Sequence, residues 1–254
     1  MLNWVKFLGT GGGRVVVFRQ LRQSGGMWLK MDGVNILIDP GPGSLIRIFE
    51  NGLEPRDLNI VILSHRHLDL SSDINAVLES ATESTKNPID LLIAPKDALE
   101  GEEPVLLKYL RKGIKEIVYL DESTDKTYQN LQIKGVIKHI HRGANTYGLQ
   151  IKSDNSSFVY VPCGRFFDDM LTAYPQNPDV MIFNTTFVKP RKNVQHLSAE
   201  DVKKMVSHLK PKKAVLTHFS VEMLKANPKQ IAADIHKDTG IPTIAAEDNM
   251  KLNF

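Results

Sequence analysis

Hydrophobic positions in the first part of the chain form short apolar or alternating runs that are typical of β-strands. The runs cover residues 4–8, 14–18, 27–31 and 35–38, and glycine-rich turns separate them. Residues 59–63 form an apolar run that predicts a strand buried on both faces. Residues 71–85 carry apolar side chains at helical spacing, at Ile74, Val77 and Leu78, and predict a helix.

Strands and helices alternate along the remaining sequence. Further strands are predicted at residues 90–94, 116–120, 128–137, 147–152, 158–161, 180–183, 213–217 and 243–245, and helices at residues 104–112, 166–174, 198–209 and 228–240. Ser198 is predicted as the N-cap of its helix, with Asp201 three residues on as its capping partner. Two strand-rich halves with interspersed helices predict an α/β protein, a four-layer α/β/β/α sandwich built as one domain over residues 1–254.

The composition is that of a globular protein. The 254 residues are 42% hydrophobic and 24% charged, and the net charge of +3 is too mild to indicate a nucleic-acid-coating protein. A single cysteine allows no intrachain disulfide, which is compatible with a reducing, cytoplasmic location. No apolar run approaches the roughly 18 residues of a membrane-spanning helix, and no signal-peptide pattern is evident. We therefore expect a cytoplasmic protein without a membrane partner.

Metal-binding chemistry is concentrated where the apolar run ends. Residues 60–70 read IVILSHRHLDL, so a strand leads into a turn that carries His65, His67 and Asp69. Imidazole nitrogen and carboxylate oxygen are ligands that zinc prefers, and a strand end can direct several of them to one point. The alternative is an ordinary polar loop. The spacing favours a metal site.

Six motifs in this order resemble the metallo-β-lactamase superfamily. They are FLGTGGG (7–13), ILIDPGPG (36–43), His-x-His-x-Asp (65–69), HRGANTYGL (141–149), VYVPCG (159–164) and LTHFS (216–220). The resemblance implies the metallo-β-lactamase fold and metal-dependent hydrolysis, with Asp39 as an acidic residue that supports the metal site. FLGTGGG resembles a phosphate-binding loop in composition, but it lacks the Lys-Ser/Thr pair, which favours a tight turn near the site.

The resemblance also implies the metal ligands. One metal would be bound by His65, His67 and His141, and the other by three further residues, Asp69, Cys163 and His218. Leu70 stands where the commonest pattern has histidine, and Cys163 stands where it has a bridging aspartate. Both departures resemble one subclass of zinc β-lactamases. Three ligands for each zinc ion leave a fourth position for water or substrate.

A different assignment of Cys163 remains open. The thiolate could join the three histidines and complete one tetrahedral site, which leaves Asp69 and His218 too few for a second ion. A free cysteine is also often a small buried hydrophobic residue. Two zinc ions are the first expectation, and one zinc ion is the alternative.

The catalytic candidates are Asp69 and His196. His196 precedes LTHFS in a pairing that resembles tRNA 3′-end processing endonucleases and related phosphodiesterases, where it donates a proton to the leaving group or contacts phosphate. His139 lies two residues before His141 and could replace it as a ligand, but the spacing to the Tyr-Gly strand favours His141. Ser64, Thr146 and Thr217 are expected to orient ligands.

These observations predict a zinc-dependent, phosphodiesterase-like hydrolase. Its expected substrate is a phosphodiester or similar small anionic ester, including nucleotide-like molecules. Basic clusters at residues 189–192 and 210–213 give weaker support for nucleic-acid contact. The alternative is a degenerate member of the fold, with one metal ion or none, that acts as a non-catalytic binding module. Residues 87–101 form either a lid or an ordinary connection, and the oligomeric state is left open.

Overall fold

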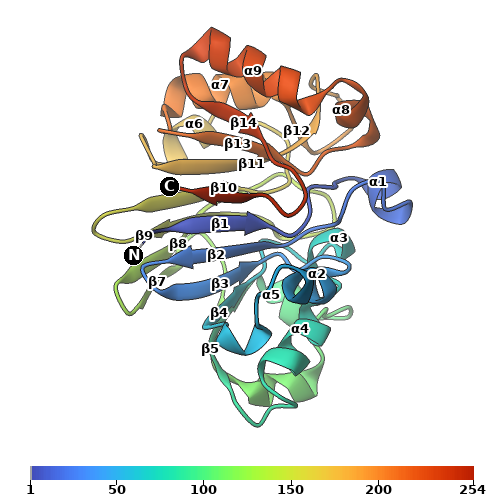
Figure 1. Cartoon of the computed structure of the whole chain (residues 1–254), viewed down its shortest axis with the longest axis vertical. Coiled ribbons are helices and arrows are strands. Elements are labelled where there is room, and N and C mark those ends of the chain that lie inside the picture. The colour runs from blue at the N-terminus through green and yellow to red at the C-terminus, as the bar shows by residue number, and fades with distance from the viewer. Residues whose placement is uncertain (1) are drawn as a thin grey trace. The chain divides into compact units, whose positions relative to one another are not determined.

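The structure is a computed structural model that describes residues 2–254. The chain divides into two compact units (Figure 1). Unit 1 comprises residues up to 10 together with residues 20–120 and 247–254. Unit 2 comprises residues 11–19 and 121–246. The chain thus returns to unit 1 for its last strand.

Unit 1 is built on one mixed sheet with the strand order β15-β1-β2-β3-β4-β5-β6. Its strands are β1 (Trp4–Phe7), β2 (Met27–Met31), β3 (Val34–Ile38), β4 (Ile60–Ile62), β5 (Ile89–Ala94), β6 (Ile114–Tyr119) and β15 (Lys251–Asn253). Pairing is antiparallel from β15 to β3 and parallel from β3 to β6. Every residue of β4 is buried, as the apolar run predicts for a strand covered on both faces.

Helices cover this sheet beside β3, β4 and β5 (Figure 1). They are α2 (Ser44–Glu50), α3 (Leu68–Ser71), α4 (Ile74–Ala81), α5 (Lys96–Leu99) and the 3-10 helices at Pro55–Asp57 and Lys108–Gly113. The apolar face of α4, with Ile74, Val77 and Leu78, packs into a buried cluster that also holds Val61 and Leu92. Burial of such side chains is the main stabilising contribution to the unit.

Unit 2 is built on a second sheet with the strand order β14-β13-β11-β10-β9-β8-β7, and a short strand, β12, pairs with β11. The strands are β7 (Asp125–Tyr128), β8 (Leu131–Lys138), β9 (Tyr147–Lys152), β10 (Ser157–Val161), β11 (Val180–Phe187), β12 (Leu197–Ser198), β13 (Ala214–Thr217) and β14 (Thr243–Ala245). Pairing is antiparallel from β7 to β10 and parallel from β10 to β14.

The helices of unit 2 are α1 (Arg14–Phe18), α6 (Met170–Ala173), α7 (Ala199–Leu209), α8 (Val221–Lys225) and α9 (Pro228–Thr239). Helices α7 and α9 lie over the parallel part of the sheet (Figure 1). Val202, Met205 and Val206 of α7 are buried against apolar residues of β11 and β13. Within residues 2–254, no helix combines the length and apolar character needed to cross a membrane.

The predicted strand at residues 14–18 is wrong, because this segment forms α1. Its β-branched residues favour a strand, but a strand needs a neighbour to pair its backbone groups. Here the backbone is paired locally, with the Val17 amide donating to the Gly13 carbonyl at 3.2 Å and the Arg19 amide donating to the Val15 carbonyl at 3.1 Å. Val16 is the buried residue of the helix.

Other predicted elements are shorter or divided. Most of the strand predicted at residues 128–137 is β8, which begins at Leu131 after a turn in which Gln129 and Asn130 connect it to β7 and Gln129 has a φ of +52°. The helix predicted at residues 104–112 is the 3-10 helix Lys108–Gly113, and the helix predicted at residues 71–85 ends at Ala81. Residues 87–101 contain β5, which pairs with β4 and β6, so they form a connection inside the fold rather than a lid.

The predicted start of α7 is confirmed. The Ser198 hydroxyl accepts a hydrogen bond from the Asp201 amide at 3.2 Å, and the Asp201 carboxylate accepts one from the Ser198 amide at 3.0 Å. The Ser198 hydroxyl also donates to the same carboxylate at 2.7 Å. This is a capping box, and it pairs amides that would otherwise be unsatisfied in a buried helix start.

Ser198→Ala should therefore lower the free energy of unfolding by about 1–2 kcal/mol, because the Asp201 amide loses its acceptor. Ser207→Ala is the matched control, since Ser207 is an exposed serine of the same helix and should change stability by less than about 0.5 kcal/mol. Urea denaturation of both variants measures the difference. Equal midpoints for the two variants would contradict this assignment.

Candidate functional site

In unit 1, the turn after β4 holds His65 through a chain of hydrogen bonds. The Ser64 hydroxyl donates to Asp39 Oδ2 at 2.6 Å, and the Ser64 amide donates to Asp39 Oδ1 at 2.7 Å. Ser64 Oγ lies 3.0 Å from His65 Nδ1. Because the hydroxyl proton is given to Asp39, Ser64 accepts the proton of His65 Nδ1, which leaves the lone pair of His65 on Nε2. This pattern is typical of a metal-binding histidine and its supporting carboxylate.

His67 lies beside His65, with the two rings 4.9 Å apart in a T-shaped arrangement. Between them, Arg66 pairs with Glu103 at 3.1 Å and with Asp97 at 3.5 Å. The Ser71 hydroxyl donates to the carbonyls of Arg66 and His67. The turn that carries the histidines is thus held by the last residue of α3 and by the segment around α5.

Asp69 and Leu70 belong to α3, directly after His67. Asp69 is partly exposed, whereas Leu70 is 3% exposed. The position that is histidine in the commonest family pattern therefore carries a buried apolar side chain here. Leu70 adds packing to this turn and contributes no ligand.

In unit 2, Cys163 and His218 are in contact. Cys163 Sγ lies 3.5 Å from His218 Nε2, and both residues are buried. Cys163 follows β10 and His218 follows β13, so two strands of the same sheet deliver them. The Asn184 amide of β11 also donates to Cys163 Sγ at 3.4 Å and to the Tyr160 hydroxyl at 2.9 Å. The sulfur is therefore held between an amide and an imidazole.

His196 completes a group of donors with Cys163 and His218. Their ligand atoms all lie within 4.8 Å of one another. The hydroxyl of Thr186 lies 3.3 Å from Nδ1 of His196 and 3.3 Å from Nδ1 of His218. One hydroxyl has a single proton, so Thr186 can donate to at most one of the two rings and accepts from any ring that carries its proton on Nδ1.

His141 and His139 have different environments in unit 2, although they are two residues apart. His141 Nδ1 donates to the carbonyl of Gln195 at 2.9 Å, and its ring lies 5.0 Å from that of His196. The carbonyl only accepts, so the lone pair of His141 is on Nε2. His141 thus has the tautomer in which Nε2 binds a metal, and its ring lies beside that of His196.

His139 has both ring nitrogens bound by protein. Nδ1 donates to the Cys163 carbonyl at 3.0 Å, and the Tyr174 hydroxyl donates to Nε2 at 2.7 Å. Burial lowers the pKa of His139 to about 4, and burial raises the pKa of Tyr174 well above 10, so His139 is neutral and Tyr174 is protonated. A side chain at Gly148 would place its Cβ 2.0 Å from the Tyr174 hydroxyl. His139 thus supports the loop of Cys163.

The glycine-rich segment at residues 11–13 packs on His218 and Phe219. The Gly12 amide donates to the Phe219 carbonyl at 2.9 Å, and a Cβ at Gly12 would lie 2.0 Å from His218 Nδ1. Only glycine, which has no Cβ, fits where the main chain lies this close to the His218 ring. The segment is a tight turn against a candidate ligand, as the sequence predicts, and the Gly12 amide is used within the protein.

Sequence reasoning missed four residues that orient these donors. They are Asn184, Thr186, Tyr174 and Gln195, of which the first two are buried in β11. A signal exists for β11, because its apolar run ends in the polar residues Asn184, Thr185 and Thr186 inside a fully buried stretch. Buried polar groups need partners, and Asn184 and Thr186 find them among the candidate ligands, whereas the Thr185 hydroxyl donates to the Phe183 carbonyl.

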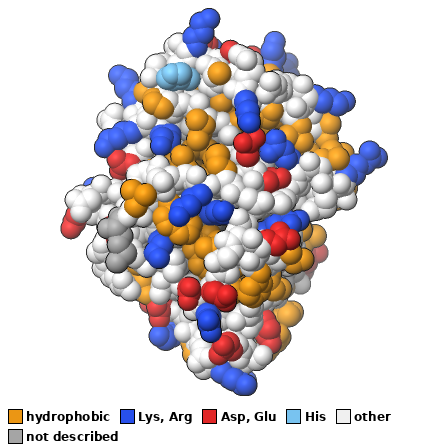
Figure 2. Space-filling model, in the orientation of Figure 1, with side chains coloured by type: hydrophobic (Ala, Val, Ile, Leu, Met, Phe, Trp, Pro, Cys, Tyr) orange, Lys and Arg blue, Asp and Glu red, His pale blue; other side chains and the backbone are white. Residues whose placement is uncertain are grey.

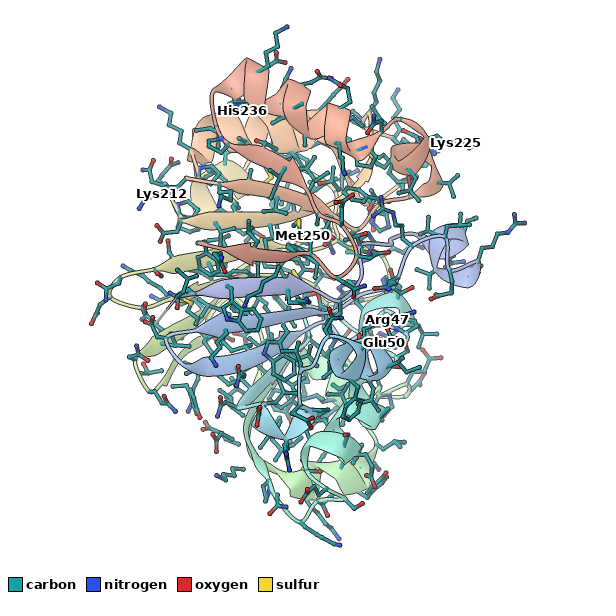
Figure 3. All side chains as sticks on the ribbon, viewed as in Figure 1. Arg47, Glu50, Lys212, Lys225, His236 and Met250 are labelled. Carbon is teal, nitrogen blue, oxygen red and sulfur yellow. The ribbon has the colours of Figure 1, made fainter. Side chains whose placement is uncertain are left out.

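The remaining histidines and the basic clusters lie outside these contacts. His208 is exposed on α7, and His236 is exposed on α9, where Figure 3 labels it and its Nδ1 donates to the Ile241 carbonyl at 2.9 Å. In the cluster at residues 189–192, Arg191 pairs with Glu222 and stacks 4.4 Å from the Phe187 ring centre. In the cluster at residues 210–213, Lys212 pairs with Asp179 at 2.8 Å.

The donor group of unit 2 fits a zinc ion. A thiolate at about 2.3 Å and an imidazole at about 2.0 Å from one tetrahedral zinc ion lie about 3.5 Å apart. This matches the 3.5 Å between Cys163 Sγ and His218 Nε2. Sulfur and imidazole nitrogen are also the donor chemistry that zinc prefers.

Fold and donors together define a mixed α/β protein with candidate metal-binding groups. A family model described as the β-lactamase superfamily domain matches residues 34–219. The chain belongs to this superfamily. It is also similar to the uncharacterized protein MJ1374 of Methanocaldococcus jannaschii, with 24% identity over 253 residues that cover 98% of this chain and 94% of the relative.

Three solved structures share the fold along the whole chain. YhfI of Bacillus subtilis, a metallo-β-lactamase fold protein, has a TM-score of 0.83 and 16% identity, with 100% of both chains covered. A diphosphatase of the PhnP family has a TM-score of 0.74 and 17% identity, with 99% of this chain and 98% of that chain covered. The short form of human tRNase Z has a TM-score of 0.71 and 17% identity, with 98% of both chains covered. The predicted fold class is confirmed.

Stability of the metal-free protein should decrease in acid because of His139. The unfolded histidine takes up a proton near pH 6.5, but the folded one does so only near pH 4. Acidification from pH 6.5 to 4 therefore favours the unfolded chain, by at most about 3 kcal/mol, and this contribution is fully present above pH 6.5.

His139→Gln is the comparison variant, because glutamine does not titrate in this range. Urea unfolding at pH 7 and at pH 4.5, with chelator present, should show a smaller loss of stability for the variant than for the wild type. Parallel losses in both proteins would show that His139 does not carry the effect.

Proposed function

We propose that this chain is a zinc-dependent hydrolase of phosphodiesters or similar small anionic esters. The observation that carries the proposal is the group formed by Cys163, His196 and His218 around the Thr186 hydroxyl. It combines a buried thiol and imidazole, at a separation suited to one ion, with a further imidazole that is partly exposed.

The ligand assignment follows the family motifs. His65, His67 and His141 are proposed to bind one ion, and Asp69, Cys163 and His218 a second ion. Support comes from the ring nitrogens, because His65 and His141 both use Nδ1 within the protein and keep the lone pair on Nε2. The contact of Cys163 with His218 favours their assignment to the same ion over a site of Cys163 with three other histidines.

Zinc bound by these donors would supply Lewis-acid chemistry, polarising the ester and making water acidic enough to attack it near neutral pH. The protein residues have complementary roles. Asp69 is a carboxylate that can orient the attacking water and accept its proton. Cys163 and His218 are buried, so little water surrounds these donors. Their electrostatic effect is therefore stronger than it would be in water.

The contacts of Thr186 support a role for His196 as a proton donor. If Nε2 of His218 is used for zinc, its Nδ1 carries the proton and donates it to Thr186 Oγ1. Thr186 then donates its own proton to Nδ1 of His196, so His196 carries its proton on Nε2. That proton is available for the oxygen of a leaving group.

The substrate class is supported by the structural neighbours and by chemistry. One neighbour is named as a diphosphatase and another as a tRNase Z, and both names refer to phosphoryl esters or anhydrides. A proton donor such as His196 is most useful when the leaving group is a poor one, such as the alkoxide of a sugar. We therefore place a phosphodiester ahead of a β-lactam as the substrate.

Elemental analysis and hydrolysis of bis(p-nitrophenyl) phosphate test the proposal together. The wild type should bind about two zinc ions per chain, and Cys163→Ser about one. The hydrolysis rate of Cys163→Ser should also fall. Loss of a residue that only supports a metal ligand lowers activity by up to roughly 100-fold, and loss of a ligand should lower it by more. His208→Ala is the matched control, because His208 is an exposed histidine of α7, and it should change neither value.

Two results would contradict the proposal. The first is a wild type that binds one zinc ion and hydrolyses no ester, together with a Cys163→Ser variant that binds none. This result would indicate a closed mononuclear site. A wild type without metal would indicate a non-catalytic binding module of the fold.

Thr186→Val tests the proton on His196. Valine keeps the shape of threonine but cannot hydrogen-bond, so the position of the His196 proton is no longer set. Hydrolysis of a dinucleotide, which has a poor leaving group, should fall by roughly 100-fold, the lower range for general-acid catalysis. Hydrolysis of bis(p-nitrophenyl) phosphate, which has a good leaving group, should fall only a few-fold.

Thr186→Ser restores the hydroxyl and should restore the dinucleotide rate at unchanged zinc content. Equal losses of Thr186→Val on both substrates would assign Thr186 to ligand orientation alone.

A further inference from the structure

Helix α1 exposes an aromatic side chain between arginines, next to a candidate metal ligand. Phe18 is 75% exposed and Val15 is 50% exposed, whereas Val16 is buried. Arg14 and Phe18 are separated by four residues, and so are Val15 and Arg19, so these side chains share one region of the helix surface. Arg14 and Arg19 are exposed as well.

The aromatic ring of Phe18 is open to solvent. Phe18 is the most exposed large hydrophobic side chain among residues 2–254. Its burial would be favourable, yet the helix turns Val16 inward and leaves the aromatic ring in water. Such a ring is available to a ligand that offers a flat surface.

The segment before α1 connects this surface to the candidate site of unit 2. Gly12 contacts the imidazole of His218 so closely that a Cβ would lie 2.0 Å from Nδ1. Gly13 lies beside Ser220 and Thr186, and it is the N-cap of α1. Two extended residues and the helical rise place the Phe18 Cα at most about 13 Å from Gly12. A short oligonucleotide spans that distance.

The charge of unit 2 suits an anionic ligand. Unit 2 carries nineteen Lys and Arg against twelve Asp and Glu, a formal charge of +7, whereas unit 1 has thirteen against seventeen, a charge of −4. Basic side chains border the surface over α7 and α9 in Figure 2. The net charge of the whole chain is small because the two units have opposite charges. The basic unit is the one that carries Cys163, His196 and His218.

We propose that α1 is a nucleobase-binding platform, on which Phe18 stacks a base of the substrate while Arg14 and Arg19 contact its phosphates. Stacking on an aromatic side chain together with arginine contacts is how proteins hold single-stranded nucleic acid without reading its sequence. The inference rests on the proposed function and narrows the substrate to a phosphodiester that carries a base.

Two chromogenic esters with the same scissile bond test the proposal. Thymidine 5′-(p-nitrophenyl phosphate) carries a base, and methyl p-nitrophenyl phosphate does not. With zinc-loaded wild type we expect a KM about tenfold lower for the thymidine ester, within the range that one stacked base provides. Phe18→Ala should remove this difference and leave kcat and the methyl ester unchanged.

Two further variants serve as controls. Phe18→Trp keeps a stacking surface and should retain the low KM for the thymidine ester. Phe49→Ala removes another exposed phenylalanine, which is 51% exposed on α2, and should change neither ester.

Binding gives a readout that does not depend on turnover. A short single-stranded oligonucleotide with a phosphorothioate backbone and one 2-aminopurine should lose fluorescence when its base stacks on wild type. Phe18→Ala should abolish the quenching. Arg14→Gln with Arg19→Gln should reduce the salt dependence of binding by about 1.4 in the log–log slope, the value for two phosphate contacts on a single strand.

The outcomes separate the two proposals. If wild type hydrolyses both esters equally, and Phe18→Ala changes neither KM nor quenching, the platform is wrong and the hydrolase stands. If wild type hydrolyses neither ester and binds no zinc, the hydrolase is wrong. Quenching that depends on Phe18 would in that case still support base stacking.

Discussion

The candidate site depends on how the protein uses the Nδ1 atoms of its histidines. A neutral imidazole has one proton and one lone pair, so a partner at Nδ1 decides what Nε2 can do. His65 donates from Nδ1 to Ser64, and His141 donates to the Gln195 carbonyl. Thr186 contacts the Nδ1 atoms of both His196 and His218. Ser64 and the Gln195 carbonyl orient their rings and set the proton on Nδ1, so the donor geometry of His65 and His141 exists before any ligand binds.

The backbone is strained at two residues of the candidate sites, Asp39 and His218. Asp39 has a φ of +53° and His218 a φ of +63°, in a region that side chains other than glycine rarely adopt. Each such residue costs on the order of 1–3 kcal/mol, which the surrounding structure must offset. Asp39 is held by two hydrogen bonds from Ser64, and the segment at Gly12 closes on the main chain after His218. Ten other non-glycine residues between 2 and 254 also have a positive φ, so the conformation of Asp39 and His218 gains its interest from the site contacts that these two residues make.

Elements governed by local pattern could be predicted from the sequence. The bounds of β2, β9 and β14 agree with the expected runs, and α7 begins at the expected capping box. Segments that depend on distant partners could not be predicted. Strand β15 exists because it pairs with β1 across the length of the chain, and residues 14–18 become a helix because their backbone is paired locally. The local pattern of hydrophobic residues contains no information about the pairing of β15 with β1 or about the local backbone pairing of residues 14–18.

The same division holds for the candidate site. The sequence alone determined the kinds of donor, their order and their positions at strand ends, because a motif such as His-x-His-x-Asp and a lone cysteine after an apolar strand are local features. Only the tertiary structure decided that His139 is bound at both nitrogens by Cys163 and Tyr174, while His141 donates from Nδ1 to the Gln195 carbonyl. It alone joined Thr186 to His196 and His218. A hydrogen bond requires its two atoms to be about 3 Å apart, and residues from separate strands reach that distance only after the chain has folded.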